Sequence, residues 1–357
     1  MLGPLVLALL MGPRGELGSQ ELPELVSQDD PVLLSSTLLF PPDDPPTPRC
    51  HASTLAETED GLVAAWFGGT REGHEDVGIW VARHDGQTWL AAQRVASGGE
   101  DEEQEHPCWN PVLFQPANGP LLLYYKVGPS PSTWWGMCMQ SNDGGKTWTD
   151  RRRLGSDPSI GALLGPVRGK PLQLDDGTIL CPSSTEHEGW RVHLERTKDL
   201  GRTWSVIGPL HDGAIFAAIQ PTLLRHADGR LQMLCRTRQK VLAQAWSSDD
   251  GASWSALTAT SLPNPNAAVD AVTLADGRHL LVYNHTLPGA EFPSGRNQLN
   301  VALSNDGETW TPALTLERDR GEFSYPAVIQ ARDGKVHLTY TYWRLAVKHV
   351  VLDPEAL

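Results

Sequence analysis

The chain has 357 residues and a formal net charge of −14, from 29 lysines and arginines against 43 aspartates and glutamates. This balance excludes nucleic acid as an expected partner, because phosphate binding needs a basic face, whereas a small acidic ligand needs only a few local arginines. The five cysteines make no disulfide framework, and no Cys or His cluster has metal-ligand spacing, so we expect neither disulfides nor a metal.

The chain begins with the apolar run MLGPLVLALLMG, which is too short to span a bilayer. This run is similar to the apolar region of a secretory signal, but it lacks a basic start and a clear small-residue cleavage site. We therefore expect an N-terminal lead-in with a signal-like segment over residues 1–30 and no integral membrane span. A periplasmic or secreted location and a cytoplasmic one both stay open. Residues 31–357 are expected to form the folded domain.

An Asp-Gly or Asn-Gly pair followed at once by an apolar stretch occurs six times, at intervals of 48 to 58 residues. The pairs begin at Asp60, Asn118, Asp176, Asp228, Asp276 and Asp333. Such pairs between apolar runs are strong hairpin signals, because both central residues of a type I′ turn need a positive φ. The series predicts six β-hairpins.

A second series follows the first five of these turns. Each member contains an Asp, a Gly and a closing Trp, as in SNDGGKTW; the series covers residues 83–89, 141–148, 197–204, 247–254 and 304–310. The Asp carboxylate can accept hydrogen bonds from backbone N–H groups of its own turn, while the Trp packs against a neighbouring strand. We therefore interpret these aspartates as structural.

Six units of strand and turn, with little helical periodicity, predict an all-β fold: a six-bladed β-propeller of four-stranded antiparallel blades. A pair of β-sandwiches is the alternative, but it does not explain two motif series in register. A propeller would bring the ends of its inner strands together around one axis in a single domain.

The second series resembles the Asp-boxes of sialidases and of other proteins with such repeats, over roughly residues 48–345. For sialidases, the resemblance implies three arginines that hold the sugar carboxylate. It also implies a tyrosine nucleophile activated by a glutamate, and an aspartate that acts as acid and base. Asp-boxes also occur in propellers of other function, so function has to be argued from the site.

Four positions match the sialidase layout around the later hairpins. In QPTLLRHADGRLQMLCRTR, Gln220 stands at the glutamate position and Arg236 at the position of the second arginine. Arg296 stands where the third arginine is expected, and Tyr325 where the nucleophile is expected. A tyrosine suits a negatively charged sugar, because a neutral phenol avoids the repulsion that a carboxylate nucleophile would meet.

The first hairpin departs from the sialidase pattern. His51 stands in place of the first arginine, and Asp76 follows as the expected acid. A histidine offers at most two donors, and only when it is protonated, so it would bind a carboxylate less well. Glutamine at position 220 cannot act as a base. Another glutamate would have to activate the tyrosine, and the candidates are Glu186, Glu188 and Glu322.

Several polar and aromatic residues in the middle of the chain have two interpretations. Trp109, Trp134 and Trp135 could form a stacking wall for a sugar ring or could pack inside the blades. Arg191 could form a structural ion pair with Glu186 or contact the substrate. His106 and Lys126 are weaker candidates for a contact with a carboxylate.

The sequence therefore indicates a sialidase-like exo-glycosidase that releases a terminal acidic sugar from a glycan and needs no cofactor. Its expected catalytic residues are Tyr325, Asp76 and His51, and its expected substrate-binding residues are Arg236, Arg296, Gln220, Glu186, Arg191, Trp109 and Trp135. One alternative is a uronate-specific lyase in which His51 and Tyr325 serve as base and acid. The other is a glycan-binding propeller without catalysis.

Overall fold

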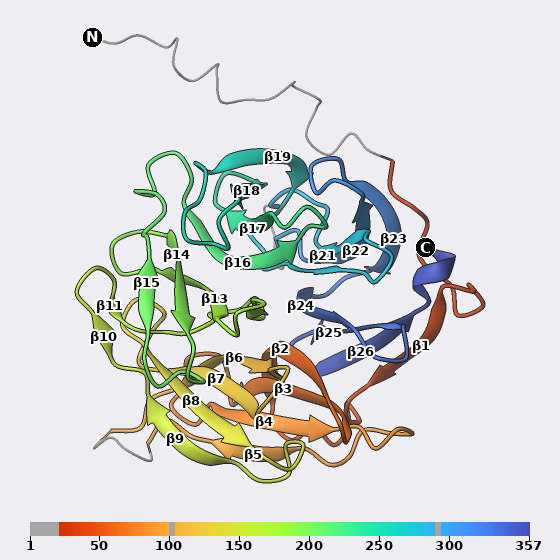
Figure 1. Cartoon of the computed structure of the whole chain (residues 1–357). Coiled ribbons are helices and arrows are strands. Elements are labelled where there is room, and N and C mark those ends of the chain that lie inside the picture. Colours follow the sequence, from red (N-terminus) through yellow and green to blue (C-terminus); the bar gives the residue numbers. More distant parts are fainter. Residues whose placement is uncertain (1–20, 100–103, 290–293) are drawn as a thin grey trace.

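The structure is a computed structural model that describes residues 21–99, 104–289 and 294–357. Six antiparallel sheets of four strands each stand around a central axis, as Figure 1 shows, so the six-bladed propeller is confirmed. The signal-like run at the start of the chain lies outside the described residues. Within the described ranges, no helix is long and apolar enough to cross a membrane.

The first three blades follow one another along the chain, and in each the strands run from the axis outward. Blade 1 contains β2 (Arg49–Thr58), β3 (Gly61–Gly69), β4 (Gly78–Arg83) and β5 (Gln93–Ala96). Blade 2 contains β6 (Cys108–Phe114), β7 (Leu121–Val127), β8 (Trp135–Ser141) and β9 (Thr149–Arg153). Blade 3 contains β12 (Leu172–Gln173), β13 (Ile179–Thr185), β14 (Arg191–Thr197) and β15 (Ser205–Ile207). A small hairpin of β10 (Ser156–Asp157) and β11 (Gly161–Ala162) connects blades 2 and 3.

The last three blades complete the ring. Blade 4 contains β16 (Ala218–Arg225), β17 (Leu231–Thr237), β18 (Val241–Ser247) and β19 (Thr258–Pro263). Blade 5 contains β20 (Asp270–Thr273), β21 (His279–Tyr283), β22 (Gln298–Ser304) and β23 (Thr311–Arg318). Blade 6 contains β24 (Phe323–Gln330), β25 (Val336–Tyr342), β26 (Ala346–Leu352) and β1 (Leu33–Leu38), and a short 3-10 helix, η1 (Pro354–Ala356), follows β26.

Blade 6 closes the ring, because its outermost strand comes from the other end of the chain. Strand β1 pairs antiparallel with β26, with Ser36 opposite Val350. The closure ties residues near both ends of the chain into one sheet, and it explains why only five Asp-boxes occur. The place of the fourth strand beside β26 is taken by β1, which precedes the other strands in the sequence, so blade 6 has no turn between its third and fourth strands that could carry a box.

Both motif series have the predicted roles. Each Asp-Gly or Asn-Gly pair lies between the first and second strands of a blade, and each box lies between the third and fourth. In the second box, Asp143 Oδ1 accepts hydrogen bonds from the N–H groups of Lys146 and Thr147, at 3.0 and 2.9 Å. The hydrogen bonds from Thr147 lower the pKa of Asp143. The box aspartates are therefore structural, as the sequence indicates.

The inner strands carry a bulge near the end opposite these turns. The pairing of β2 with β3 shifts between His51 and Thr54, and equivalent shifts occur in β6, β16 and β24. At each bulge one residue has a left-handed backbone: Ala52, Asn110, Gln220 and Tyr325, with φ between 36° and 55°. Bulges turn side chains away from the regular alternation of a strand. The loops between second and third strands open at the same end of the ring, so the site is sought there.

The interior of the blades is apolar, and all five cysteines are free and buried in it. Burial raises the pKa of the Cys235 thiol well above its ordinary value. A buried thiol of this kind acts as a small apolar side chain, as the sequence predicts for the cysteines in apolar runs.

Candidate active site

Tyr325 lies on the bulge of β24, where the inner strand of blade 6 reaches the axis. Its φ is 55°, and its side chain is 8% exposed. Arg168, from the segment before β12, donates a hydrogen bond of 2.6 Å to the carbonyl oxygen of Tyr325 and a second one to that of Pro326. The buried guanidinium of Arg168 thus stabilises the backbone of the bulge, and the bulge in turn fixes the position of the Tyr325 phenol.

The contacts of Arg236 explain why the buried strand β17 carries an arginine next to its last residue. Its Nη1 donates a hydrogen bond of 2.6 Å to Tyr325 Oη, from blade 4 to blade 6. Its guanidinium also lies over the ring of Trp190, 5.1 Å from the ring centroid. A charge-assisted bond of this length stabilises negative charge on the phenol oxygen. The two residues that the sequence placed at the site are therefore in direct contact.

Two further arginines lie over the ring of Tyr325. The guanidinium carbon of Arg296 is 5.4 Å from the ring centroid, and that of Arg168 is 5.7 Å from it. Arg296 also binds Glu322, with 3.1 Å between Nη1 and Oε1. Because these cations converge on one phenol in an acidic protein, the site is locally positive and suited to an anionic ligand.

Glu322 is nearly fully buried and joins the arginines of blades 5 and 6. Besides Arg296, it accepts hydrogen bonds from Arg344 Nε at 2.6 Å and from Ser324 at 2.7 Å. Burial alone would raise the pKa of Glu322, but the hydrogen bonds and charge of Arg344 lower it below its usual range. Glu322 is thus a partner of two arginines with a weakened basicity, and its service as a base for Tyr325, one of three candidates from the sequence, stays a prediction.

Sequence reasoning missed Arg344. This residue lies between β25 and β26, and its guanidinium also pairs with Glu72 and approaches His51 Nε2 at 3.4 Å. An arginine from blade 6 therefore lies next to the histidine that replaces the first arginine of the sialidase pattern. The motif comparison could not find it, because the three-residue hairpin loop of Trp343 to Leu345 contains no Gly, Asn or Asp to mark it as a turn.

His51 is 2% exposed, and its ring centroid lies 4.1 Å from that of Tyr325. Its Nδ1 is 2.8 Å from Thr341 Oγ1. Burial, followed by the charge of Arg344 and of the other arginines, holds the pKa of His51 well below its usual value. The imidazole is therefore neutral at neutral pH. Protonation of this imidazole is therefore less favourable than that of an exposed histidine, and the catalytic role of His51 stays a prediction.

Gln220 occupies the bulge position in β16 that Tyr325 occupies in β24. Its backbone N–H donates to Ser184 Oγ at 3.1 Å, while its side chain is 3% exposed. Among the described residues, neither Gln220 Oε1 nor Arg236 Nε has a hydrogen-bond partner, although both atoms are buried. Buried polar atoms without partners are costly, and they are frequent at binding sites, where a ligand satisfies them.

Asp76 lies in the loop between β3 and β4. Its carboxylate accepts hydrogen bonds from Thr70 N and Oγ1, the latter at 2.7 Å, and lies 2.8 Å from His74 Nδ1. Burial would raise its pKa, but the bonds from Thr70 and His74 lower it. A side chain at Gly69 would meet Asp76 Oδ1 at 2.7 Å, so this glycine lets the carboxylate lie against the strand end. The catalytic role of Asp76 stays a prediction.

Glu186 follows β13, and its pKa shifts in the direction opposite to that of Asp76. Burial raises its pKa, against the lowering effects of Arg236 and of a hydrogen bond with Trp190. Arg191 does not pair with Glu186 as the sequence suggested; its Nη2 binds Glu188 at 2.6 Å. Burial therefore makes the protonated form of Glu186 more favourable than in a free glutamate, and the carboxyl group lies close enough to Arg236 to interact with its charge.

The three tryptophans that the sequence offered as a stacking wall or as packing residues are buried. Trp109, Trp134 and Trp135 are 7%, 6% and 9% exposed, and Trp109 Nε1 donates to the carbonyl of Gly128 at 2.8 Å. All three belong to apolar clusters of the interior, as the packing interpretation predicts, and a contact with a sugar stays a prediction. Lys126 is fully buried and donates to the carbonyl oxygens of Asn110 and Pro166, which gives it a structural role in the backbone.

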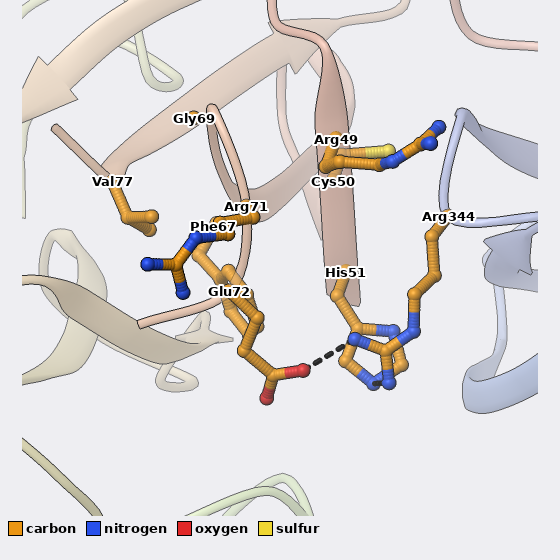
Figure 2. A pocket seen from close by; sticks show the side chains of 9 residues that line it. All are labelled: Arg49, Cys50, His51, Phe67, Gly69, Arg71, Glu72, Val77 and Arg344. Carbon is orange, nitrogen blue, oxygen red and sulfur yellow. Dashed lines mark hydrogen bonds and ion pairs between the residues drawn. The ribbon is translucent and has the colours of Figure 1, made fainter. Parts of the chain in front are cut away.

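A cavity of about 230 Å³ opens beside His51, at the junction of blades 1 and 6. Figure 2 shows Glu72 pointing toward the guanidinium of Arg344, with His51 next to this pair. No group of three or more His, Cys, Asp or Glu side chains in the described ranges could hold a metal ion.

The sequence pattern of the BNR repeat-like domain family matches residues 60–338 of the chain. Over 222 residues the chain is 23% identical to a protein named anhydrosialidase from Macrobdella decora. This alignment covers 56% of the chain but only 28% of that relative, so the chain spans less than a third of the curated protein it matches.

Three solved structures are similar in fold. A Dyadobacter fermentans protein described as of unknown function has a TM-score of 0.74 at 17% identity, and the match covers 90% of this chain and 98% of that one. A Hadza microbial sialidase has a TM-score of 0.71 at 19% identity, with 87% and 66% covered. An intramolecular trans-sialidase from Ruminococcus gnavus has a TM-score of 0.69 at 13% identity, with 86% and 95% covered.

Proposed function

Because the chain belongs to the BNR repeat-like domain family within the sialidase superfamily, we propose that it is an exo-glycosidase that releases a terminal acidic sugar from a glycan. The observation that carries this proposal is the contact of Arg236 with Tyr325 Oη at 2.6 Å, beneath two further arginines. A phenol under a cluster of cations is a nucleophile matched to a negatively charged sugar. The names of the similar proteins point to the same class of substrate.

In this reaction Arg236 and Arg296 bind the carboxylate of the sugar, and Tyr325 Oη attacks the anomeric carbon as the glycosidic C–O bond breaks. The proton of the phenol passes to His51, whose ring centroid lies 4.1 Å from that of Tyr325, and this transfer has to overcome the burial and the arginine charges that lower the pKa of the imidazole. Water then hydrolyses the bond between Tyr325 and the sugar and regenerates the phenol. Gln220 Oε1, which has no partner in the described protein, can accept a hydrogen bond from a sugar hydroxyl.

Two carboxyl groups compete for the protonation of the leaving oxygen. Asp76 is the residue that the sialidase resemblance implies, but the bonds from Thr70 and His74 favour its ionised form. Glu186 suits the role better, because a proton donor must hold a proton at working pH and burial raises its pKa.

The neutral state of His51 also favours a second candidate, a uronate lyase on the same site. Here His51 would take the proton α to the carboxylate, while Arg236 neutralises the carboxylate and makes that proton more acidic. The C–O bond at the β carbon then breaks, a C=C bond forms, and Tyr325 gives its proton to the leaving oxygen.

Product mass distinguishes the candidates. The wild type and the Tyr325→Phe and His51→Gln variants are incubated with sialyl-terminated and uronate-terminated oligosaccharides and analysed by mass spectrometry. The proposal expects a free acidic sugar that contains one added water, lost in Tyr325→Phe. An unsaturated product that is lighter by one water and absorbs in the ultraviolet would instead identify a lyase. Binding of a glycan by wild type and Tyr325→Phe alike, with no product from either, would identify a binding protein.

A further inference from the structure

The cavity at the junction of blades 1 and 6 is built mainly from cationic and apolar groups. Its lining comes from the start of β2, the end of β3 and its following loop, and the β25–β26 loop (Figure 2). The lining residues that matter for recognition are Arg49, His51, Arg71, Glu72 and Arg344. The cavity therefore begins at His51, which touches the nucleophile, and extends away from the axis.

The three arginines of the lining differ in their partners. Arg344 is fully compensated, because its guanidinium pairs with both Glu322 and Glu72. Arg49 and Arg71 are exposed, and neither side chain has a hydrogen bond or ion pair with any described residue. Two arginines that are not paired with a carboxylate of the described residues thus lie at the opening of the cavity.

The charge of the lining is opposite to that of the chain. Three arginines against one glutamate, Glu72, leave two positive charges, whereas the whole chain carries −14. His51 adds none, because its low pKa keeps it neutral. A concave surface of one sign focuses the field and raises the local concentration of counter-ions. Such a lining recognises an anion through charge-assisted bonds from guanidinium groups.

The size of the cavity limits what it can hold. Pockets that bury a drug-sized ligand measure roughly 300–1,000 Å³, so about 230 Å³ suits one substituted sugar unit and not a whole oligosaccharide. Because the cavity is continuous with His51, its occupant lies within about one sugar unit of the group that Tyr325 attacks.

We infer that this cavity binds a second anionic group of the substrate, a sulfate ester or a carboxylate on the terminal sugar or on the sugar next to it. The substrate is then a glycan with two neighbouring negative charges. One is held by Arg236 and Arg296, and the other by Arg49 and Arg71. The inference rests on the proposed function for the first of these charges.

The test compares matched probes that differ by one anionic group. Sialyl-terminated and uronate-terminated oligosaccharides are used unsulfated, with one sulfate ester on the terminal sugar, and with one sulfate ester or one carboxylate on the next sugar. Affinities are measured by calorimetry in the Tyr325→Phe background, which prevents turnover, and release of the acidic sugar is measured with Tyr325 present. The inference expects at least one doubly charged probe to bind about tenfold or more tightly than its singly charged counterpart.

Variants of the lining supply the site-specific control. Arg49→Gln and Arg71→Gln should each reduce that preference several-fold, and Glu72→Gln should preserve or increase it, because the last change removes the only negative charge of the lining. Arg332→Gln, at the Asp-Gly turn of blade 6 on the opposite end of the ring, removes one positive charge from the protein and should leave the preference unchanged.

The outcomes separate this inference from the proposed function. Equal affinities for singly and doubly charged probes, with release of the acidic sugar intact, would overturn the inference and leave the proposed function standing. A preference that Arg332→Gln reduces as much as Arg71→Gln does would also overturn it, because the effect would then come from net charge. No binding and no release with any probe would overturn both.

Discussion

The hydrogen bond from Arg236 to Tyr325 gives the sharpest prediction. Arg236→Met keeps most of the length of the side chain but removes a charge-assisted bond of 2.6 Å in a site where the arginine is 7% exposed. Such a bond contributes about 1.5–3 kcal/mol, and about 1.4 kcal/mol is a factor of ten in rate. We therefore expect kcat for release of the acidic sugar to fall about 10- to 150-fold.

Arg238→Met is the matched control. Arg238 also lies over Trp190, at 4.2 Å, but it follows the end of β17, is exposed and, among the described residues, is not hydrogen-bonded to Tyr325. We expect its kcat to stay close to that of the wild type. Steady-state kinetics on the best substrate, with thermal unfolding to confirm that both variants fold, would measure both effects. If Arg236→Met raised KM but left kcat within about threefold of the wild type, the arginine would bind substrate only, and the reasoning about the phenol oxygen would be refuted.

Three further predictions follow from the buried titratable groups. Glu186→Gln should remove the alkaline limb of the pH profile of kcat, whereas Asp76→Asn should leave that limb in place; the reverse result would assign proton donation to Asp76. His51→Gln should lower kcat. The wild type should stay active well below pH 6.5, because the lowered pKa of His51 keeps its imidazole neutral there. A loss of wild-type activity centred near pH 6.5 that the variant lacks would contradict this assignment. Burial lowers the pKa of Lys126 to about 7, so the unfolded chain binds more protons than the native one between about pH 7 and 10, and native stability should rise with pH there. Measured by urea unfolding against Lys126→Met, the wild type should gain up to about 4 kcal/mol across that window, and parallel curves for the two proteins would refute the assignment.

The sequence predicted the fold well because the decisive signals are local. A residue pair such as Asp228-Gly229 specifies its own turn, and an Asp-box aspartate such as Asp143 bonds to the backbone of its own loop. Neither depends on distant contacts, so six turns and five boxes were enough to count blades and assign strands. The ring closure by β1 has no such signal, because it depends on a pairing between the two ends of the chain.

The site was only partly accessible to the same reasoning. Arg236, Arg296 and Tyr325 were found because they stand at fixed distances from turns, and the structure brings them into one cluster. Arg168 and Arg344 were missed, because no local pattern distinguishes a buried arginine from a surface one. The two interpretations of Trp135 could not be separated from the sequence for a related reason: both faces of a strand inside a blade are buried, so alternation does not tell a sugar-facing side chain from a packed one.

One sequence feature could have indicated which residues lie near the axis: three of the inner-strand bulge residues are followed by a proline. Asn110, Gln220 and Tyr325 each precede a proline and each have a left-handed backbone on an inner-strand bulge. The bulge turns carbonyl groups away from the sheet ladder, and these need donors from elsewhere. Arg168 supplies them to Tyr325 and Pro326, and Lys126 supplies one to Asn110. This explains two buried cations to which no carboxylate of the described residues is bonded. The nucleophile and its support are thus one structural unit. The left-handed bulge points the Tyr325 side chain into the site and leaves backbone carbonyl groups without partners in the sheet. Buried cations bind these carbonyl groups and so stabilise the bulge.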